Sequence, residues 1–485
     1  MKKNLSFYTI IFIASMVVTK LSGLLAKIIL ARVITPYEYG IITLLVLSLP
    51  GLLQIFTNSF LFELISHSRE GRKYFGFSMI YSVFSIALIV SFFYLFQTQI
   101  FSFLKLPDTS HVLYLLGLFL TIISVTFLGN FTGLFRGLRD YSMASFITTA
   151  PSVLRLIILI FAVYAASISG FGALFLIFAL PPVIVLLAIL AYKAGPIANL
   201  LKKSSAVPPK SMLQFGFYVY TVGIFCGFVE QLTKIIVSHD LGIVYQGYYD
   251  VSLSVIAILA FSFTAMQFIS VPEATNNKDK RDILFKKGEL GEITRALFAF
   301  MIFCVGILII YPVQLVALLF SSSYAPAADY IYILAIGYVF LFVQQFMAYL
   351  NISTSKNMAE NRILFYITLS MSLVYPFFTH FMISFYGFMG AYLSATIALI
   401  VYSLLTIYYS KDKTPIHALT YRIERLIVAA GLALVPIYCF NMSFLAGLVY
   451  SACVYLLLIF ALGYLHKDML LRVIRKETKQ DAPSN

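Results

Sequence analysis

Long apolar segments recur along the whole chain and limit what it can fold into. About fourteen stretches hold roughly 20 consecutive apolar residues each, the length that a helix needs to cross a bilayer. They cover approximately residues 5–33, 40–65, 74–97, 111–135, 142–167, 170–193, 212–238, 244–271, 294–319, 328–350, 360–383, 386–409, 423–441 and 444–465. Because backbone groups in a bilayer must find their hydrogen bonds within the chain, these segments are expected as helices. The sequence therefore predicts an all-α polytopic membrane protein.

Basic residues are distributed unevenly between the connections of these segments. Most of the 34 lysines and arginines fall in alternate connections, from Lys2 and Lys3 at one end to the run from Lys467 to Lys479 at the other. Connections rich in Lys and Arg stay in the cytoplasm, so both termini are expected there and the protein is expected in the plasma membrane. The net charge of +14 therefore indicates membrane orientation and not nucleic-acid binding.

A weak internal repeat relates the two halves of the chain. When the sequence is shifted by 207 positions, KIILARVITPYEYG (27–40) lies over KIIVSHDLGIVYQG (234–247). This register places the first segment on the seventh and the second on the eighth. Because six is an even number, both six-helix lobes are expected to enter the membrane in the same direction, related by an axis along its normal. The expected domains are an N-lobe with its linker (1–210), a C-lobe (211–410), and a terminal helix pair with its tail (411–485).

Cations within the segments are candidates for binding substrate, because each ionisable residue at bilayer depth costs about 2.5 to 3.5 kcal/mol. Lys20 and Lys27 are seven residues apart, so they project from one face of the first helix, about 10 Å apart. Arg155 lies near the middle of the fifth segment. Cations outnumber anions in this half, which favours a phosphate or diphosphate ligand. For Lys20 and Arg155 the alternative is a buried ion pair or snorkelling toward the membrane face, and for Lys27, near the outer end of the helix, it is snorkelling.

Four further residues are candidates for coupling or gating: Glu63, Glu230, Lys234 and Asp250. Glu63 could instead pair with a cation of its own half. Glu230 and Lys234 are four residues apart in the order that favours a helical ion pair, so a purely structural pair is the alternative. Asp250 could be no more than a carboxylate at the membrane interface. The histidines lack metal-ligand spacing, so no metal and no cofactor is expected, and a coupling ion, Na⁺ or H⁺, is left open.

Two short stretches resemble a known family. LARVITPYEYGIITLL (30–45) resembles the loop between the first two helices of the polysaccharide-export flippases, in which a Leu-Ala-Arg end precedes a Pro, an acidic residue and Tyr-Gly. The turn LRDYSMA (138–144) is the second motif-like stretch. Those flippases belong to the multidrug, oligosaccharidyl-lipid and polysaccharide exporter superfamily. The chain is similar also to the lipid II flippases, whose first helix presents cations to the cavity, as Lys20 and Lys27 would do here.

The resemblance implies two six-helix lobes around a cationic cavity. It implies translocation of undecaprenyl- or dolichyl-phosphate-linked saccharides to the outer leaflet, with membrane lipids and other glycan-assembly membrane proteins as partners. A groove for the lipid tail would fall on residues 423–465. In the second half, Asp240 replaces an expected apolar residue and Pro36 has no counterpart.

Three functions compete for a chain of this kind. A lipid-linked oligosaccharide flippase working by alternating access is the expected one, and it is not an enzyme. A multidrug or cation exporter of the same superfamily would need a cavity richer in carboxylates than in lysines. A membrane glycosyltransferase or polymerase would need an outer catalytic loop with paired acids, and the predicted outer connections are short.

Overall fold

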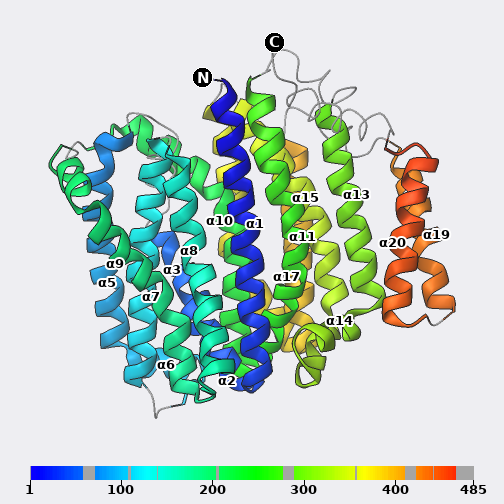
Figure 1. Cartoon of the computed structure of the whole chain (residues 1–485), viewed down its shortest axis with the longest axis horizontal. Helices are drawn as coiled ribbons and strands as arrows, with labels where there is room; N and C mark the ends of the chain where they lie inside the picture. Colours follow the sequence, from blue (N-terminus) through cyan, green and yellow to red (C-terminus); the bar gives the residue numbers. More distant parts are fainter. Residues whose placement is uncertain are drawn as a thin grey trace. The chain divides into compact units, whose positions relative to one another are not determined.

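The computed structural model describes residues 2–57, 71–107, 111–138, 140–203, 207–276, 289–354, 358–409, 422–440 and 442–465. Every regular element within these residues is helical (Figure 1). The elements are α1 (Lys2–Val33), α2 (Pro36–Ile42), η1 (Thr43–Ser48), α3 (Leu49–Thr57), η2 (Gly71–Tyr74), α5 (Phe75–Leu95), α6 (Gln97–Phe103), α7 (His111–Gly137), α8 (Tyr141–Ile160), η4 (Phe161–Ala165), α9 (Phe171–Lys203), α10 (Lys210–Asp240), α11 (Ile243–Asn276), α13 (Glu289–Ile310), α14 (Pro312–Leu319), η6 (Ser322–Ala328), α15 (Ile331–Thr354), α16 (Met358–Tyr386), α17 (Phe388–Tyr409), α19 (Ile423–Cys439) and α20 (Phe444–Ala461).

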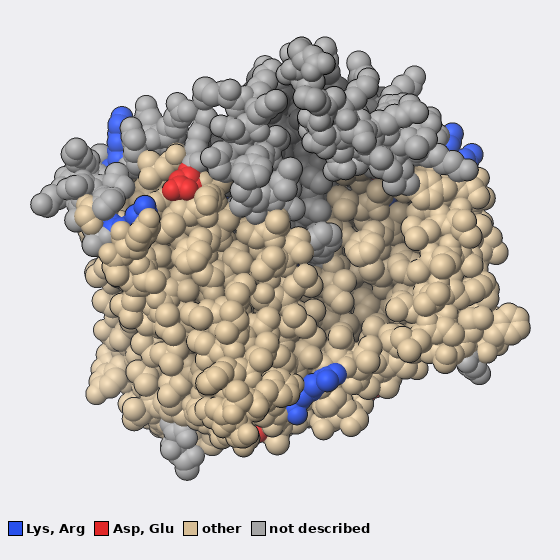
Figure 2. All heavy atoms as spheres, viewed as in Figure 1, with Lys and Arg blue, Asp and Glu red and all other residues tan. Residues whose placement is uncertain are grey.

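The helices confirm the predicted fold class. Each predicted segment coincides with a helix over the part of it that the structure describes. Ten helices in that part are long and apolar enough to cross a membrane, and the bent pair Ser322–Ala328 and Ile331–Met347 makes an eleventh if it counts as one span. The described surface in Figure 2 is almost without charged side chains across its middle, as a lipid-facing surface requires. The chain is an all-α polytopic membrane protein, and the number fourteen stays a prediction.

The turn between α1 and α2 is built by the residues of the TPYE stretch. The hydroxyl of Thr35 accepts a hydrogen bond from the backbone N–H of Glu38 at 3.3 Å, and the Glu38 carboxylate accepts one from the Thr35 N–H at 3.0 Å. This reciprocal capping box, with Pro36 in the first helical position, starts α2 abruptly. The polar and proline residues of the motif therefore serve the turn itself.

The linker predicted at the end of the N-lobe is partly helical, because α9 continues into it past a kink. The backbone of Lys193 leaves helical geometry, with φ −116° and ψ 18°, and a second helical piece then continues to Lys203. Pro196 falls in the first turn of that piece, where proline is tolerated because the N–H it lacks would be unpaired anyway. The linker expected at the end of the N-lobe therefore contains a short helix, which follows the break at Lys193.

The chain divides into two compact units. The first comprises Met1–Val255, Val316–Ala327 and Asn361–Ala398, and the second comprises Ile256–Leu315, Ala328–Glu360 and Leu399–Asn485. This division follows packing and does not test the division into repeats, so the lobe boundaries given above stay a prediction.

In the first unit, α1 packs along α8, and α7 packs against α8, α9 and α5 (Figure 1). Buried polar groups join these helices to one another. The Asn130 carbonyl accepts a hydrogen bond from Ser78 at 2.8 Å, and its amide donates to Ser82 at 2.8 Å. Such interhelical bonds contribute on average about 0.6 kcal/mol in a bilayer. They help to fix the frame on which α1 is held.

In the second unit, α19 and α20 form an antiparallel hairpin, as predicted for the terminal pair. Arg422 donates to the Gly463 carbonyl at 2.8 Å and Arg425 to the Leu462 carbonyl at 2.5 Å, so two cations cap the carbonyl end of α20. The Tyr455 hydroxyl donates to the Ala299 carbonyl at 2.9 Å, which joins the hairpin to α13.

Candidate functional site

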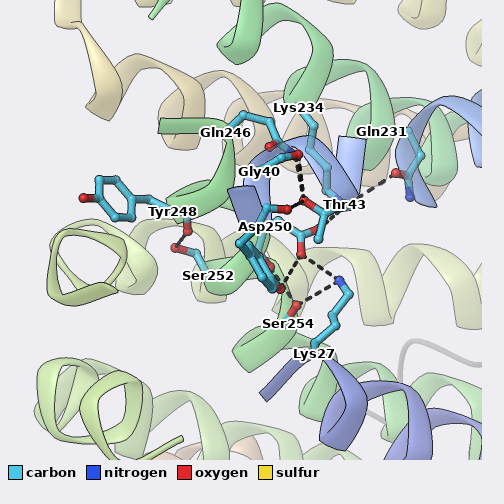
Figure 3. Close-up of polar contacts among 11 residues, drawn as sticks. Lys27, Gly40, Thr43, Gln231, Lys234, Gln246, Tyr248, Asp250, Ser252 and Ser254 are labelled. Atoms are coloured by element: carbon cyan, nitrogen blue, oxygen red, sulfur yellow. Dashed lines mark hydrogen bonds and ion pairs between the residues drawn. The ribbon is translucent and has the colours of Figure 1, made fainter. Parts of the chain in front are cut away.

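A buried cluster of charges lies in the first unit, where α1, α2, α10 and α11 meet (Figure 3). Its centre is Asp250 on α11, whose side chain is fully buried. The Lys27 ammonium lies 2.8 Å from Oδ2 of Asp250, and the Lys234 ammonium lies 2.7 Å from Oδ1. The carboxylate therefore bridges two lysines that come from two different helices.

Neutral polar groups complete the surroundings of the carboxylate. The Tyr39 hydroxyl donates to Oδ2 of Asp250 at 2.9 Å, and Lys27 also donates to the Ser254 hydroxyl at 3.0 Å. Ser254 in turn donates to the backbone carbonyl of Asp250 at 2.7 Å. Lys234 makes a longer bond of 3.4 Å to the side-chain carbonyl of Gln231. The three charged groups are thus held in place by hydrogen bonds from four helical segments.

The cluster holds more positive than negative charge. Two ammonium groups face one carboxylate, which leaves one positive charge in excess. The Lys27 side chain keeps 19% exposure, whereas that of Lys234 keeps 3%. Another molecule can therefore approach the cluster at Lys27. The excess positive charge favours an anion.

Lys20 extends the same face of α1 by two turns. Its side chain is exposed, and it interacts electrostatically with Glu230 on α10. Lys27 interacts electrostatically with Glu230 as well. The structure therefore brings together five of the residues predicted from the sequence: Lys20, Lys27, Glu230, Lys234 and Asp250.

Two of the sequence expectations need correction. Lys234 forms its ion pair with Asp250, not with Glu230 one turn earlier on α10, because its side chain turns toward α11. Asp250 is a buried, doubly paired carboxylate, so it is more than a solvated carboxylate at a helix end. The i,i+4 spacing predicted the wrong partner for Lys234. Spacing within one helix does not report which neighbouring helix supplies a closer counter-ion.

Arg155 is held on a different helix contact. Its Nε donates to the Phe178 carbonyl on α9 at 3.1 Å, and its guanidinium lies 4.6 Å from the centre of the Phe178 ring. A guanidinium over an aromatic face gains a cation–π interaction. The structure does not place Arg155 with the Lys27 cluster, and the candidate Glu63 lies outside the described residues.

Arg32, in the last turn of α1, caps another helix. Its Nε donates to the Leu319 carbonyl at 3.1 Å, and it also donates to the Leu318 carbonyl. Both carbonyls lie at the end of α14, where unpaired acceptors and the helix dipole favour a cation.

Sequence reasoning missed several polar residues of the cluster, although the 207-residue register could have found some of them. Tyr39 and Gln246 are equivalent positions in that register, as are Thr43 and Asp250. The Gln246 amide donates to the Thr43 hydroxyl at 3.2 Å, which is the counterpart of the bond from Tyr39 to Asp250. Ser254 carries no comparable signal. Among the described residues, no group of three His, Cys, Asp or Glu side chains could hold a metal ion.

Comparisons with known proteins agree with this architecture. The lipid II flippase MurJ in an inward closed conformation has a similar structure, with a TM-score of 0.69 at 13% identity, over 93% of this chain and 98% of that one. An inward-facing multidrug resistance MATE family transporter of the MOP superfamily has a TM-score of 0.57 at 14% identity, over 83% and 96% of the two chains. The MATE transporter VcmN of Vibrio cholerae, solved as a mutant, has a TM-score of 0.53 at 14% identity, over 84% and 96%.

At such low identities these likenesses establish the fold, which is the predicted one. No curated protein matches the sequence. The family model described as "Polysaccharide biosynthesis protein" matches residues 29–329. Because that match spans more than half of the chain and includes the turn between α1 and α2, the protein belongs to this polysaccharide biosynthesis family.

Proposed function

We propose that the protein is a flippase that moves an isoprenoid-(di)phosphate-linked oligosaccharide from the cytoplasmic to the outer leaflet by alternating access. The observation that carries the proposal is the cluster of Lys20, Lys27 and Lys234 at the junction of α1, α10 and α11, which holds more cations than its carboxylates neutralise. Membership of a polysaccharide biosynthesis family and the fold shared with a lipid II flippase support it.

The electrostatics of the cluster explain why the substrate should be anionic. Charges inside a bilayer are costly and persist where they meet partners or a water-filled path. One buried carboxylate neutralises only one of the two lysines, and a phosphate or diphosphate group would neutralise the other. In this proposal Lys20 and Lys27 bind the phosphate, the saccharide passes through the hydrated path, and the isoprenoid remains in lipid.

Arg155 has a separate place in the proposal. Its contacts with Phe178 join α8 to α9, and α8 is the helix along which α1 packs. Arg155 therefore supports the helix that carries Lys20 and Lys27. Direct binding of phosphate by Arg155, which the sequence predicts, stays a proposal beside this supporting role.

The plasma membrane, with both termini in the cytoplasm, is the location that the basic connections favour. In that orientation the substrate meets Lys20 before Lys27 as it leaves the cytoplasmic side. Membrane lipids and other glycan-assembly membrane proteins are the partners that this location supplies.

A test in cells measures where lipid-linked saccharide accumulates. Depletion of the protein should raise the lipid-linked saccharide of the cytoplasmic leaflet, and neither Lys20→Ala nor Lys27→Ala should reverse the rise at wild-type protein levels. Lys73→Ala, which removes an exposed lysine of η2, is the matched control and should reverse it. Full export by both Lys20→Ala and Lys27→Ala would contradict the proposal.

A multidrug exporter is the second candidate, since MATE transporters share the fold. It predicts drug sensitivity on depletion without any change in lipid-linked saccharide. The excess of lysine over carboxylate in the cluster argues against a cationic drug, because like charges repel the ligand.

A further inference from the structure

The contacts around Asp250 follow a two-fold pattern in the 207-residue register. Residue pairs 39–250 and 246–43 are equivalent in that register, and both are hydrogen-bonded, at 2.9 and 3.2 Å. The glycines of the register, Gly40 and Gly247, touch each other. A side-chain carbon on Gly247 would lie 2.5 Å from the Pro36 carbonyl oxygen and 3.4 Å from the Gly40 nitrogen. Reciprocal contacts of this kind are what a two-fold axis through the glycine pair produces.

Lys27 and Lys234 are also equivalent positions in this register. The symmetry of the contacts breaks at Asp250, because its counterpart is the neutral Thr43. One carboxylate thus serves two equivalent lysines, taking 2.8 Å and 2.7 Å contacts on its two separate oxygens. We call the ammonium groups of Lys27 and Lys234 the fork; the two carboxylate oxygens of Asp250 lie between them.

The charge of the fork suits a diphosphate better than a single carboxylate. Ammonium groups bind oxyanions as point charges, and a diphosphate diester carries two negative charges on adjacent phosphates. With Asp250 as the only anion in contact with the two lysines, this pair keeps one positive charge in excess. The exposed fraction of Lys27 supplies the direction of approach, since Lys234 is closed off behind the carboxylate.

We propose that Lys27 and Lys234 form one two-pronged site for the diphosphate of the lipid-linked substrate, and that Asp250 occupies this site until the substrate displaces it. This inference rests on the proposed function and extends it to Lys234 and Asp250. Tyr39 and Ser254, which now bind the carboxylate and Lys27, hold the fork in shape.

Displacement of the carboxylate also loosens the contact between the two repeats. Asp250 joins α11 to α1 through Lys27 and to α2 through Tyr39. When a diphosphate binds both Lys27 and Lys234, Asp250 keeps only the hydrogen bond from the Tyr39 hydroxyl. Substrate arrival therefore weakens the junction at Gly40 and Gly247, which couples binding to opening of this end of the first unit.

The test is a titration of the purified full chain in lipid nanodiscs with inorganic pyrophosphate. Asp250→Asn removes the competing charge and keeps the shape, so it should bind pyrophosphate at least about tenfold more tightly than the wild type. Lys234→Met should bind at least about tenfold more weakly, although Lys234 is buried behind the carboxylate.

Glu230→Gln is the matched control for a general effect of charge. Glu230 acts on Lys27 electrostatically, as Asp250 does, but makes no ion pair with it in the described structure. Its neutralisation should tighten pyrophosphate binding by less than about threefold, because no competitor is removed. Equal gains from Asp250→Asn and Glu230→Gln would overturn displacement, and unchanged binding by Lys234→Met would overturn the fork.

Asp250→Asn leaves two lysines without a counter-ion and can fail to fold. In that case the double variant Lys234→Met/Asp250→Asn, which removes one charge of each sign, is compared with Lys234→Met alone. Tighter binding by the double variant supports displacement, and equal binding overturns it. Where Asp250→Asn does fold, saturating pyrophosphate should raise its thermal midpoint more than that of the wild type.

The inference and the proposed function can fail separately. A protein that moves lipid-linked saccharide normally as Lys234→Met, and binds pyrophosphate normally in that form, lacks the fork but remains a flippase. A wild-type protein whose depletion leaves lipid-linked saccharide unchanged is not the proposed flippase, whatever it binds.

Discussion

Asp250 is the residue on which the charge balance of the first unit depends. Its carboxylate is fully buried, and it satisfies two lysines and a tyrosine that come from three other helices. Breaking a buried ion pair by removing one partner leaves an uncompensated charge, which costs far more than the pair contributes. The same residue is therefore expected to matter for stability and for substrate binding, by separable measurements.

The stability effect is a direct prediction. Asp250→Ala should lower the free energy of unfolding by about 3 to 5 kcal/mol, because Lys27 and Lys234 lose their shared counter-ion. Thermal unfolding of the purified protein in nanodiscs measures the loss. Asp329→Ala, at an exposed aspartate, should stay within about 0.5 kcal/mol of the wild type. A midpoint for Asp250→Ala equal to that of the control would contradict the buried cluster.

Single residues also show where sequence reasoning stops. Lys20 and Lys27 could be placed on one face of a helix because helical periodicity is a local property. The partners of Lys27 could not, since Asp250 is 223 residues away and nothing local reports on the contact. Arg155 shows the same limit, because its half-buried position against Phe178 depends on the packing of α8 on α9.

At the scale of elements, the turns at the ends of α1 and α10 hold the cluster in place. The turn after α1 contains the Thr35–Glu38 capping box, and the turn after α10 contains Gly242 at a φ of 105°. These turns are followed by α2 and α11, whose glycines Gly40 and Gly247 meet face to face. Glycine is needed there because the backbone of one helix occupies the space of a side chain on the other.

The glycine contact yields a prediction with a close control. Gly247→Ala should destabilise the protein by about 1 to 3 kcal/mol, since the added carbon meets the Pro36 carbonyl at 2.5 Å and the backbone must move. Gly227→Ala, on the neighbouring helix α10, meets nothing within 4 Å and should be neutral or stabilising by up to about 1 kcal/mol. Thermal unfolding of both variants decides the matter, and equal midpoints would argue against the close approach.

The helix boundaries could be predicted from the sequence where a side chain caps the helix or a proline starts it. Pro36 and its capping box fix the start of α2, and the Asp140 side chain caps the start of α8, the helix that covers the predicted segment 142–167. The break within α9 was less predictable, since a lysine such as Lys193 does not by itself end a helix and Pro196 fits the first turn of the next piece. Local side-chain chemistry therefore predicts the starts of α2 and α8 but not the break at Lys193.

At the scale of the whole molecule, hydropathy was sufficient to predict the fold. Apolar length specifies a membrane helix almost independently of tertiary contacts, because the bilayer leaves few alternatives. The faint similarity of residues 27–40 and 234–247 indicated a repeat, and the reciprocal contacts of Tyr39 and Gln246 agree with that register. Which charges face one another remained hidden, because insertion into a membrane constrains the number of charges and not their pairing.

The central claim is that the cations of α1 carry a lipid-linked substrate across the bilayer. The most direct measurement reconstitutes the purified protein in liposomes with a fluorescent isoprenoid-diphosphate saccharide. It then follows quenching of the label by a reductant that cannot cross the membrane. Wild-type protein should expose the label of both leaflets, and Lys27→Ala should expose only the outer half, at equal protein incorporation. Lys73→Ala should match the wild type. Full exposure by Lys27→Ala, or exposure of only the outer half by the wild type, would contradict the account.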